Sequence, residues 1–162
     1  MKKQKGFSLI ELLIVVAIIL IIAAIAIPNL MRSKMAANEA SAVASLRTIN
    51  TGEVTYQNTY NTFTTDLATL GPKAATCGTP SSTGACLIDN LLASATAATT
   101  PKSGYFFKVA GGAATYTSEA QPAVAGSSGI RGFCSDQNLV LFYVTPGSGS
   151  MGNCTPAGGT PL

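Results

Sequence analysis

Residues 6–31 have the sequence GFSLIELLIVVAIILIIAAIAIPNLM, in which an unbroken apolar run, 12–27, is framed by Glu11 and Pro28. A helix of about 20 residues is long enough to cross a bilayer core. Residues 7–31 are therefore predicted to form a membrane-spanning helix. The alternative is a cleaved secretory signal peptide, which also has a basic start and an apolar core. Against it, the run has no clear small-residue cleavage site and has a carboxylate at its head.

Glu11 is the residue in this stretch that most needs an explanation. A charged side chain inside a spanning helix costs about 2.5–3.5 kcal/mol on insertion scales, so it suggests a function. Ser8 and Glu11 also have the spacing of a capping box, which satisfies backbone N–H groups at the start of a helix. Capping explains why the carboxylate is tolerated, but not why it follows Gly6-Phe7-Ser8. We favour a role in assembly over capping alone.

Residues 2–12, KKQKGFSLIEL, resemble the type III signal sequence of type IV prepilins and pseudopilins. In that family a basic leader ends in Gly before Phe, and a Glu follows four residues after the Phe. The resemblance implies that a prepilin peptidase cleaves between Gly6 and Phe7 and N-methylates Phe7. It also implies that Glu11 pairs with the Phe7 amine of a neighbouring subunit during filament assembly.

The charge distribution indicates a topology. The net charge of +3 equals the contribution of Lys2, Lys3 and Lys5 in the leader, residues 1–6. Basic residues beside a spanning helix favour the cytoplasmic side, which places the rest of the chain outside. We expect an inner-membrane precursor and then an extracellular pilus.

Pro28 removes a helical hydrogen bond and predicts a kink in the helix. The family resemblance also implies that the helix melts locally at this proline in filaments.

After Pro28 the pattern becomes that of an amphipathic helix over residues 32–60. Small and apolar residues recur at intervals of three and four, so we expect them to pack on the sheet of the globular head that follows (residues 61–162). They are Ala36, Ala37, Ala40, Val43, Ala44, Leu46 and Ile49. Glu39, Ser45 and Arg47 lie off this stripe. The helix is expected to end near Thr59, where Thr, Tyr and Asn become frequent.

Residues 61–162 are predicted to form a globular head. It comprises a loop region (61–103), an antiparallel sheet (104–145) and a C-terminal disulfide loop (146–162), with helical turns at 66–70 and 87–92. Aromatic and β-branched runs bounded by Gly predict four strands: 105–109, 114–118, 132–134 and 139–144. The fold class is thus α+β, a long helix packed on a small antiparallel sheet, and the order of the strands resembles the pilin head.

The four cysteines lie in the C-terminal half, without a CxxC pair and in a chain without histidine. The common zinc sites are therefore excluded, and an even number of cysteines behind a membrane segment predicts disulfides. Cys77 and Cys86 flank a Gly/Pro/Ser/Thr loop, and Cys134–Cys154 closes a loop of about 20 residues, worth about 3 kcal/mol. We predict these two pairs among the three possible connectivities.

No histidine-based catalytic group exists, and charged residues make up only 10% of the chain, with no basic stripe for nucleic acid. We expect no enzyme, cofactor, metal site or small-molecule substrate. The leading interpretation is a subunit of a type IV pilus used for adhesion, motility or DNA uptake. Its partners are then further copies in a helical filament, the prepilin peptidase, the pilus assembly machinery and the membrane. Alternatives are a minor pilin or pseudopilin of a secretion or competence machine, and a membrane-anchored adhesin or lectin-like head.

Overall fold

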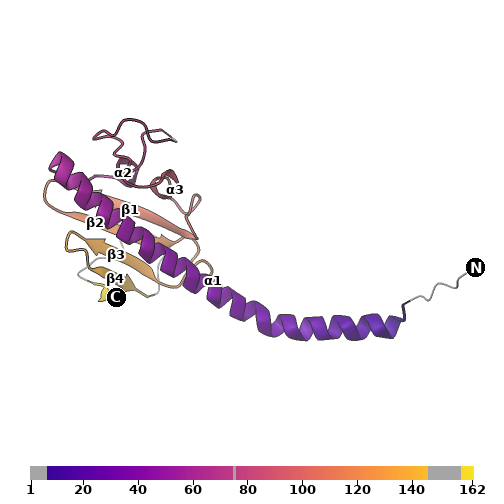
Figure 1. The fold of residues 1–162 in the computed structure, drawn as a ribbon. Helices are drawn as coiled ribbons and strands as arrows, with labels where there is room; N and C mark the ends of the chain where they lie inside the picture. Colours follow the sequence, from indigo (N-terminus) through magenta and orange to yellow (C-terminus); the bar gives the residue numbers. More distant parts are fainter. Residues whose placement is uncertain (1–6, 75, 146–157) are drawn as a thin grey trace, which may run out of the picture. The chain divides into compact units, whose positions relative to one another are not determined.

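A computed structural model describes residues 7–74, 76–145 and 158–162 (Figure 1). Its longest element is helix α1 (Leu9–Tyr60), which is 52 residues long. The chain divides into two compact units, one up to Lys34 and the other from Met35 onward. The predicted α+β class is confirmed, because the second part of α1 packs on a small antiparallel sheet in the second unit.

The first unit contains the apolar part of α1. The helix begins after Ser8, and it continues through Pro28 without a break. Every large apolar side chain from Leu9 to Met31 is at least 46% exposed. Among the described residues, α1 is the one helix whose length and composition allow it to cross a membrane. This half of α1 therefore needs a cover from outside its own unit, because apolar surface is driven out of water.

The second unit contains an antiparallel sheet in the order β1-β2-β3-β4-β5. Each strand pairs with the next along the chain, so the predicted meander is confirmed. A fifth strand was not predicted; it lies in the Gly/Pro/Ser-rich tail and pairs Thr160 with Tyr143. The strands are β1 (Tyr105–Gly111), β2 (Tyr116–Pro122), β3 (Gly132–Asp136), β4 (Leu141–Val144) and β5 (Thr160–Pro161).

Two strands begin later than predicted, and the turns explain why. Gly112 N–H donates to the Thr115 carbonyl, so Thr115 closes the β1–β2 turn instead of starting a strand. At the β3–β4 turn, Leu139 has φ 63°, which is left-handed backbone and incompatible with a strand. β4 therefore begins at Leu141.

Two short helices occupy the predicted helical turns, α2 (Leu67–Leu70) and α3 (Asn90–Ala93). An aspartate caps each of them: Asp66 accepts from Thr69 N–H at 2.9 Å, and Asp89 accepts from Leu92 N–H at 2.7 Å. Such N-caps satisfy donors that a short helix cannot pair internally. Both helices present buried leucines to the core.

The buried face of α1 differs from the predicted alanine stripe. Leu46 and Ile49 are buried as expected, but Ala36, Ala37, Ala40 and Ala44 are exposed and Val43 is half-buried. The buried face instead consists of Glu39, Ala42, Ser45, Leu46, Ile49, Asn50, Gly52, Glu53 and Tyr56. The prediction assumed that polar side chains face water. Here they are buried because hydrogen-bond partners in the rest of the head offset the cost of desolvation.

Asn50 connects α1 to two strands within the core. Its Nδ2 donates to Ser135 Oγ on β3 at 2.8 Å. Its Oδ1 accepts from the Tyr116 hydroxyl at 3.0 Å and from the Ser118 hydroxyl at 3.2 Å, both on β2. All four residues are buried. One side-chain amide thus satisfies three buried partners and fixes the rotation of α1 over the sheet.

We expect Asn50→Ala to destabilise the protein by about 2–3 kcal/mol, because it leaves buried hydroxyls without their shared partner. The measurement is urea unfolding of the detergent-solubilised full chain, followed by near-UV circular dichroism. Asn58→Ala is the matched control: Asn58 lies on the same helix but is exposed, so its effect should stay within about 0.5 kcal/mol. Equal losses in the two variants would contradict the role of Asn50.

Candidate assembly site

Phe7 and Glu11 lie at the start of α1. Phe7 is separated from the helix by Ser8 and is 85% exposed. The Ser8 backbone N–H donates to Glu11 Oε2 at 2.9 Å, which is one half of the capping box. Gly6, the other residue of the predicted cleavage site, lies outside the described residues. The structure therefore gives Glu11 a capping contact, the less favoured of the two roles considered for it.

The capping contact leaves room for a second role. An ionised carboxylate has about four acceptor sites, and the Ser8 N–H occupies one of them. Glu11 is exposed and is surrounded on α1 by exposed apolar side chains, Ile10, Leu12 and Ile14 among them. An amine that approached this carboxylate in apolar surroundings would be attracted far more strongly than in water. Capping holds the side chain in place, and pairing of Glu11 with an amine stays a prediction.

Pro28 lies inside α1 and is exposed. Because proline has no N–H, the Ala24 carbonyl loses its usual helical partner there. One turn later the Ser33 hydroxyl donates to the Asn29 carbonyl at 3.0 Å, an alternative bond that competes with the helical ladder. Pro28 is thus a weak point in the helical hydrogen bonding, and its melting in filaments stays a prediction.

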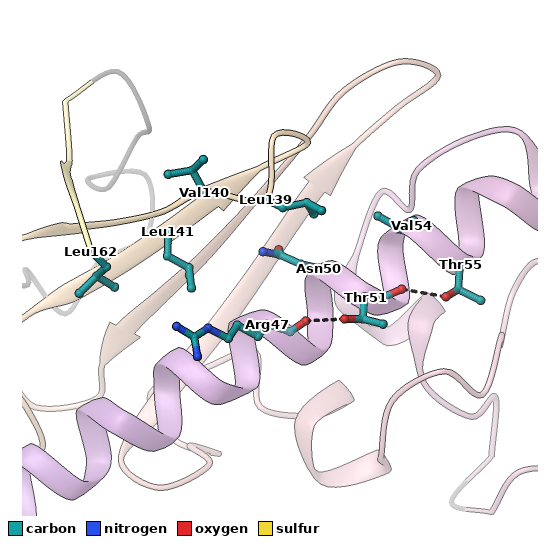
Figure 2. Close-up of a pocket in the computed structure, with 9 residues that line it drawn as sticks. All are labelled: Arg47, Asn50, Thr51, Val54, Thr55, Leu139, Val140, Leu141 and Leu162. Atoms are coloured by element: carbon teal, nitrogen blue, oxygen red, sulfur yellow. Dashed lines mark hydrogen bonds between the residues drawn. The ribbon is translucent and has the colours of Figure 1, made fainter.

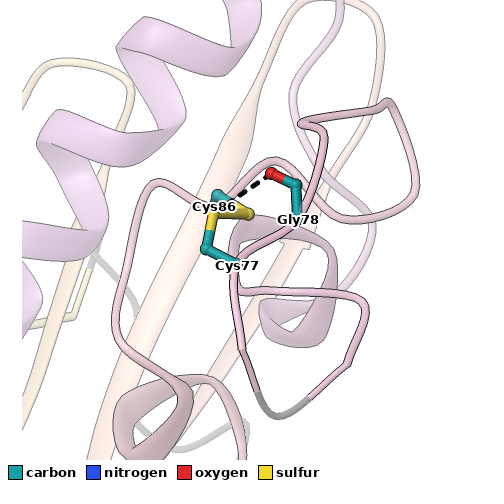
Figure 3. The surroundings of a disulfide bond; sticks show 3 residues. All are labelled: Cys77, Gly78 and Cys86. Carbon is teal, nitrogen blue, oxygen red and sulfur yellow. Dashed lines mark hydrogen bonds between the residues drawn. A yellow bond between two sulfur atoms is a disulfide. The ribbon is translucent and has the colours of Figure 1, made fainter.

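A disulfide joins Cys77 and Cys86, the pair predicted from the sequence (Figure 3). Their Cα atoms are 5.7 Å apart, and closing so short a loop is worth about 2.5 kcal/mol in the chain-entropy account. Backbone bonds secure the base of the loop: Ala85 N–H donates to Thr69 O, and Leu87 N–H donates to Leu70 O. The disulfide therefore ties this loop to the end of α2.

The second predicted pair cannot be followed to its end, because Cys154 falls outside the described residues. Cys134 is buried in β3 opposite Glu119 of β2. Strand residues alternate between faces, and Ala120 and Ser118 face α1 and the core. Cys134 therefore faces the opposite side of the sheet, and Cys134–Cys154 stays a prediction.

Glu39 fixes the loop between β2 and β3 to α1. Its carboxylate accepts from the backbone N–H groups of Ile130 and Arg131 and forms a 2.8 Å ion pair with the Arg131 guanidinium. Arg131 also lies 5.5 Å from the ring centres of Phe133 and Tyr143. Burial alone would raise the pKa of Glu39, but these hydrogen bonds and the charge of Arg131 outweigh it and lower the pKa. Glu39 is thus held as a carboxylate.

Glu53 is a fully buried acid on the same face of α1. One carboxyl oxygen accepts from Thr64 N–H at 3.0 Å, and the other contacts the Thr64 hydroxyl. Burial raises the pKa of Glu53, although the hydrogen bonds from Thr64 oppose this effect. The contact ties the chain after α1 back onto the helix.

Glu39, Asn50 and Glu53 were not singled out in the sequence, although a signal was available. Together with Leu46 they repeat at intervals of seven, four and three residues, which places them on one helical face. Polar residues in register with a buried leucine indicate hydrogen-bonded burial. Within the part of the chain that the structure describes, no group of three metal-ligating side chains occurs.

Comparison with known proteins gives a family match and two relatives. The prokaryotic N-terminal methylation motif matches residues 1–27. The type IV wide pilus major component PilA4 of Thermus thermophilus is 44% identical over 70 residues, 43% of this chain and 53% of that protein. The type IV major pilin protein PilA of Myxococcus xanthus is 43% identical over 54 residues, 33% of this chain and 24% of that protein. The matched regions thus span about half of the first relative and a quarter of the second.

We expect Glu53→Gln to change how stability depends on pH. Since the folded-state pKa lies above the ordinary 4.5, the folded protein binds this proton more tightly, and stability falls as pH rises through the folded pKa. Gln is neutral, and its amide can bond to both Thr64 groups. The free energy of unfolding of the variant should therefore increase relative to that of the native chain as pH rises from about 4 to 8, as measured by urea unfolding.

The control is Glu53→Ala, which also lacks the titrating group but loses both hydrogen bonds with Thr64. It should be less stable than Glu53→Gln by about 1–3 kcal/mol at every pH. Parallel pH profiles for the native chain and Glu53→Gln would show that the carboxyl does not titrate as inferred.

Proposed function

We propose that the chain is a type IV pilin, a structural subunit that polymerises into an extracellular pilus filament. The observation that carries the proposal is the methylation motif over residues 1–27, whose large apolar side chains are exposed along α1. Both relatives carry names of major pilus components, which favours a major pilin. The proposed role is assembly, without a catalytic step.

The first proposed step is processing at the membrane. A prepilin peptidase cuts between Gly6 and Phe7 and methylates the new Phe7 amine, as the motif suggests. Before assembly the bilayer covers residues 7–31. The basic leader, with Lys2, Lys3 and Lys5, stays in the cytoplasm and the head lies outside, in accordance with the positive-inside rule. Cleavage removes these lysines.

The second proposed step is the exchange of lipid for neighbouring copies. The apolar side chains of α1 move from the bilayer into contact with other α1 helices, which keeps them out of water. The Phe7 amine of one subunit pairs with Glu11 of the next, because neither charge is stable alone in apolar surroundings. Local melting at Pro28 lets the helix adapt within the filament. The pilus assembly machinery is the partner that drives this exchange.

Glu11→Gln separates the two roles of Glu11. Gln still accepts the Ser8 N–H bond but has no charge to pair with an amine. We expect the native chain to appear in filaments sheared from cells, beginning at N-methylated Phe7. The variant should be processed but nearly absent from that fraction, at least about tenfold reduced. Immunoblotting and N-terminal peptide mass spectrometry measure both.

Ser8→Ala is the matched control, because the capping bond uses the Ser8 backbone and survives the substitution. It should assemble as the native chain does. Normal filaments from Glu11→Gln would leave capping as the role of Glu11. A native chain that retains Met1, or that is cut after Ile27, would overturn the proposal as a whole.

We further propose that Cys134 and Cys154 form the second disulfide. Cys134 faces the side of the sheet away from α1, and in the sequence Cys154 lies between β4 and β5, of which β4 pairs directly with β3, the strand of Cys134. Non-reducing peptide mapping of sheared filaments should recover a Cys134–Cys154 peptide beside the Cys77–Cys86 peptide. A peptide that joins Cys134 to Cys77 or Cys86, or an alkylated free thiol at Cys134, would contradict this pairing.

A further inference from the structure

A groove of about 600 Å³ lies between α1 and the β4 edge of the sheet (Figure 2). One wall is α1 from Arg47 to Thr55, and the other consists of residues 139–141 and Leu162. We call it the α1–β4 groove. It gathers four of the exposed large apolar side chains of the head, each 37% to 57% exposed: Val54, Leu139, Val140 and Leu162. An apolar surface gathered in this way is typical of an interaction site.

The helical wall of the groove is less polar than its sequence suggests. The Thr51 hydroxyl donates to the Arg47 carbonyl at 3.0 Å, and the Thr55 hydroxyl donates to the Thr51 carbonyl at 2.8 Å. The donor hydrogens are therefore used within α1. Among the lining residues, Arg47 alone carries a charged side chain. The groove thus suits an apolar side chain with a negative charge beside it.

Leu139 adds evidence that this surface has a use. It adopts φ 63° in the β3–β4 turn, where its N–H donates to the Asp136 carbonyl at 2.9 Å. The left-handed region disfavours a residue with a Cβ atom and favours Gly or Asn. An apolar side chain is nevertheless kept there, half exposed, in the groove. Strain of this kind is often found where a side chain serves a function.

A matching surface lies on α3. Leu91 is 62% exposed, and the exposed acid Asp89 precedes it by two residues. The other exposed large apolar side chains of the head outside the groove are Val124 and Ile130, among the described residues. Ile130 donates its backbone N–H to Glu39, an acid that is already paired with Arg131. Leu91 with Asp89 is therefore the combination that complements the groove and Arg47.

The two surfaces lie at opposite edges of the head. The chain after α3 is bonded to β1, since Phe107 N–H donates to the Ala95 carbonyl at 2.7 Å. The groove adjoins β4, which is at the other end of the strand order except for the short β5. Figure 1 shows α3 on one side of α1 and β4 on the other. A subunit therefore cannot bring its own α3 into its own groove.

We propose that the α1–β4 groove of one subunit receives residues Asp89–Leu91 of the next copy, with Leu91 in the groove and Asp89 beside Arg47. The proposal rests on the filament function and names a contact between heads. Because the two surfaces differ and lie at opposite edges, the contact is heterologous and repeats from copy to copy, as an open helical assembly requires.

Photocrosslinking in assembled filaments tests the contact. Val140 is replaced by p-benzoylphenylalanine in the full-length chain, filaments are sheared and irradiated, and the crosslinked dimer is analysed by peptide mass spectrometry. We expect a dimer in which residue 140 is joined to the peptide that contains Asp89–Leu91. The control places the same probe at Val124, which is exposed but lies outside the groove, and should not give that peptide.

The possible outcomes separate this contact from the filament proposal. Filaments with no dimer from position 140, or with a dimer through another peptide, would overturn the groove contact and leave the filament function intact. If the native chain forms no filaments, the proposed function itself fails. If the probe alone blocks assembly, the charge variants below decide.

Arg47→Gln and Asp89→Asn each remove one charge, and Asn still caps α3. We expect each single variant to reduce sheared filament by about two- to fivefold, and the double variant to be no worse than either single one. Independent losses that multiply in the double variant would contradict the pairing of Arg47 with Asp89.

Leu139→Asn relieves the backbone strain at residue 139. The variant monomer should therefore unfold at a urea concentration no lower than that of the native chain, while the yield of sheared filament falls.

Discussion

The position of α1 over the sheet depends on three buried polar contacts. Glu39 binds the loop before β3, Asn50 joins β2 and β3, and Glu53 holds the chain that follows α1. Apolar burial favours the contact between helix and sheet, but it has no direction and tolerates rotation of the helix. Hydrogen bonds to buried polar groups do not tolerate it, because each unmade bond leaves a desolvated group. They therefore set which face of α1 remains outside, including the wall from Arg47 to Thr55.

The two buried acids show that similar positions on one helix face need not have similar chemistry. Glu39 accepts two backbone N–H groups and faces a guanidinium, so it favours the charged form and its pKa is lowered. Glu53 is buried and is bonded to the neutral Thr64 groups; burial, with a smaller effect of the Asp66 charge, raises its pKa. Glu39 contributes an ion pair with Arg131, and Glu53 contributes hydrogen bonds with Thr64 in the core.

The sequence was sufficient for the features that depend on local pattern. The apolar run, the motif around Phe7 and Glu11, the Gly-bounded strands and the aspartate-led turns each carry their signal within a few residues. The face of α1 was predicted wrongly because polar side chains were assumed to face water. The partner that makes burial of Asn50 favourable, Ser135, lies 85 residues away in the sequence. β5 was missed because its two residues are ordered by pairing with β4 and not by their own propensity. The αL turn at Leu139 violates residue preference, so no propensity argument leads to it.

In the proposed filament, adhesion between subunits and their register have different sources. The apolar half of α1 offers a large surface, but a nearly uniform run of Ile, Leu, Val and Ala can slide along another such run at little cost. Register then requires directional groups, and the proposed contacts assign this role to the carboxylate of Glu11 and to Arg47 on the head. Charged side chains are few in this chain, so a charged residue of one subunit meets few wrong partners of opposite charge on the next. A low charge content therefore favours specific assembly.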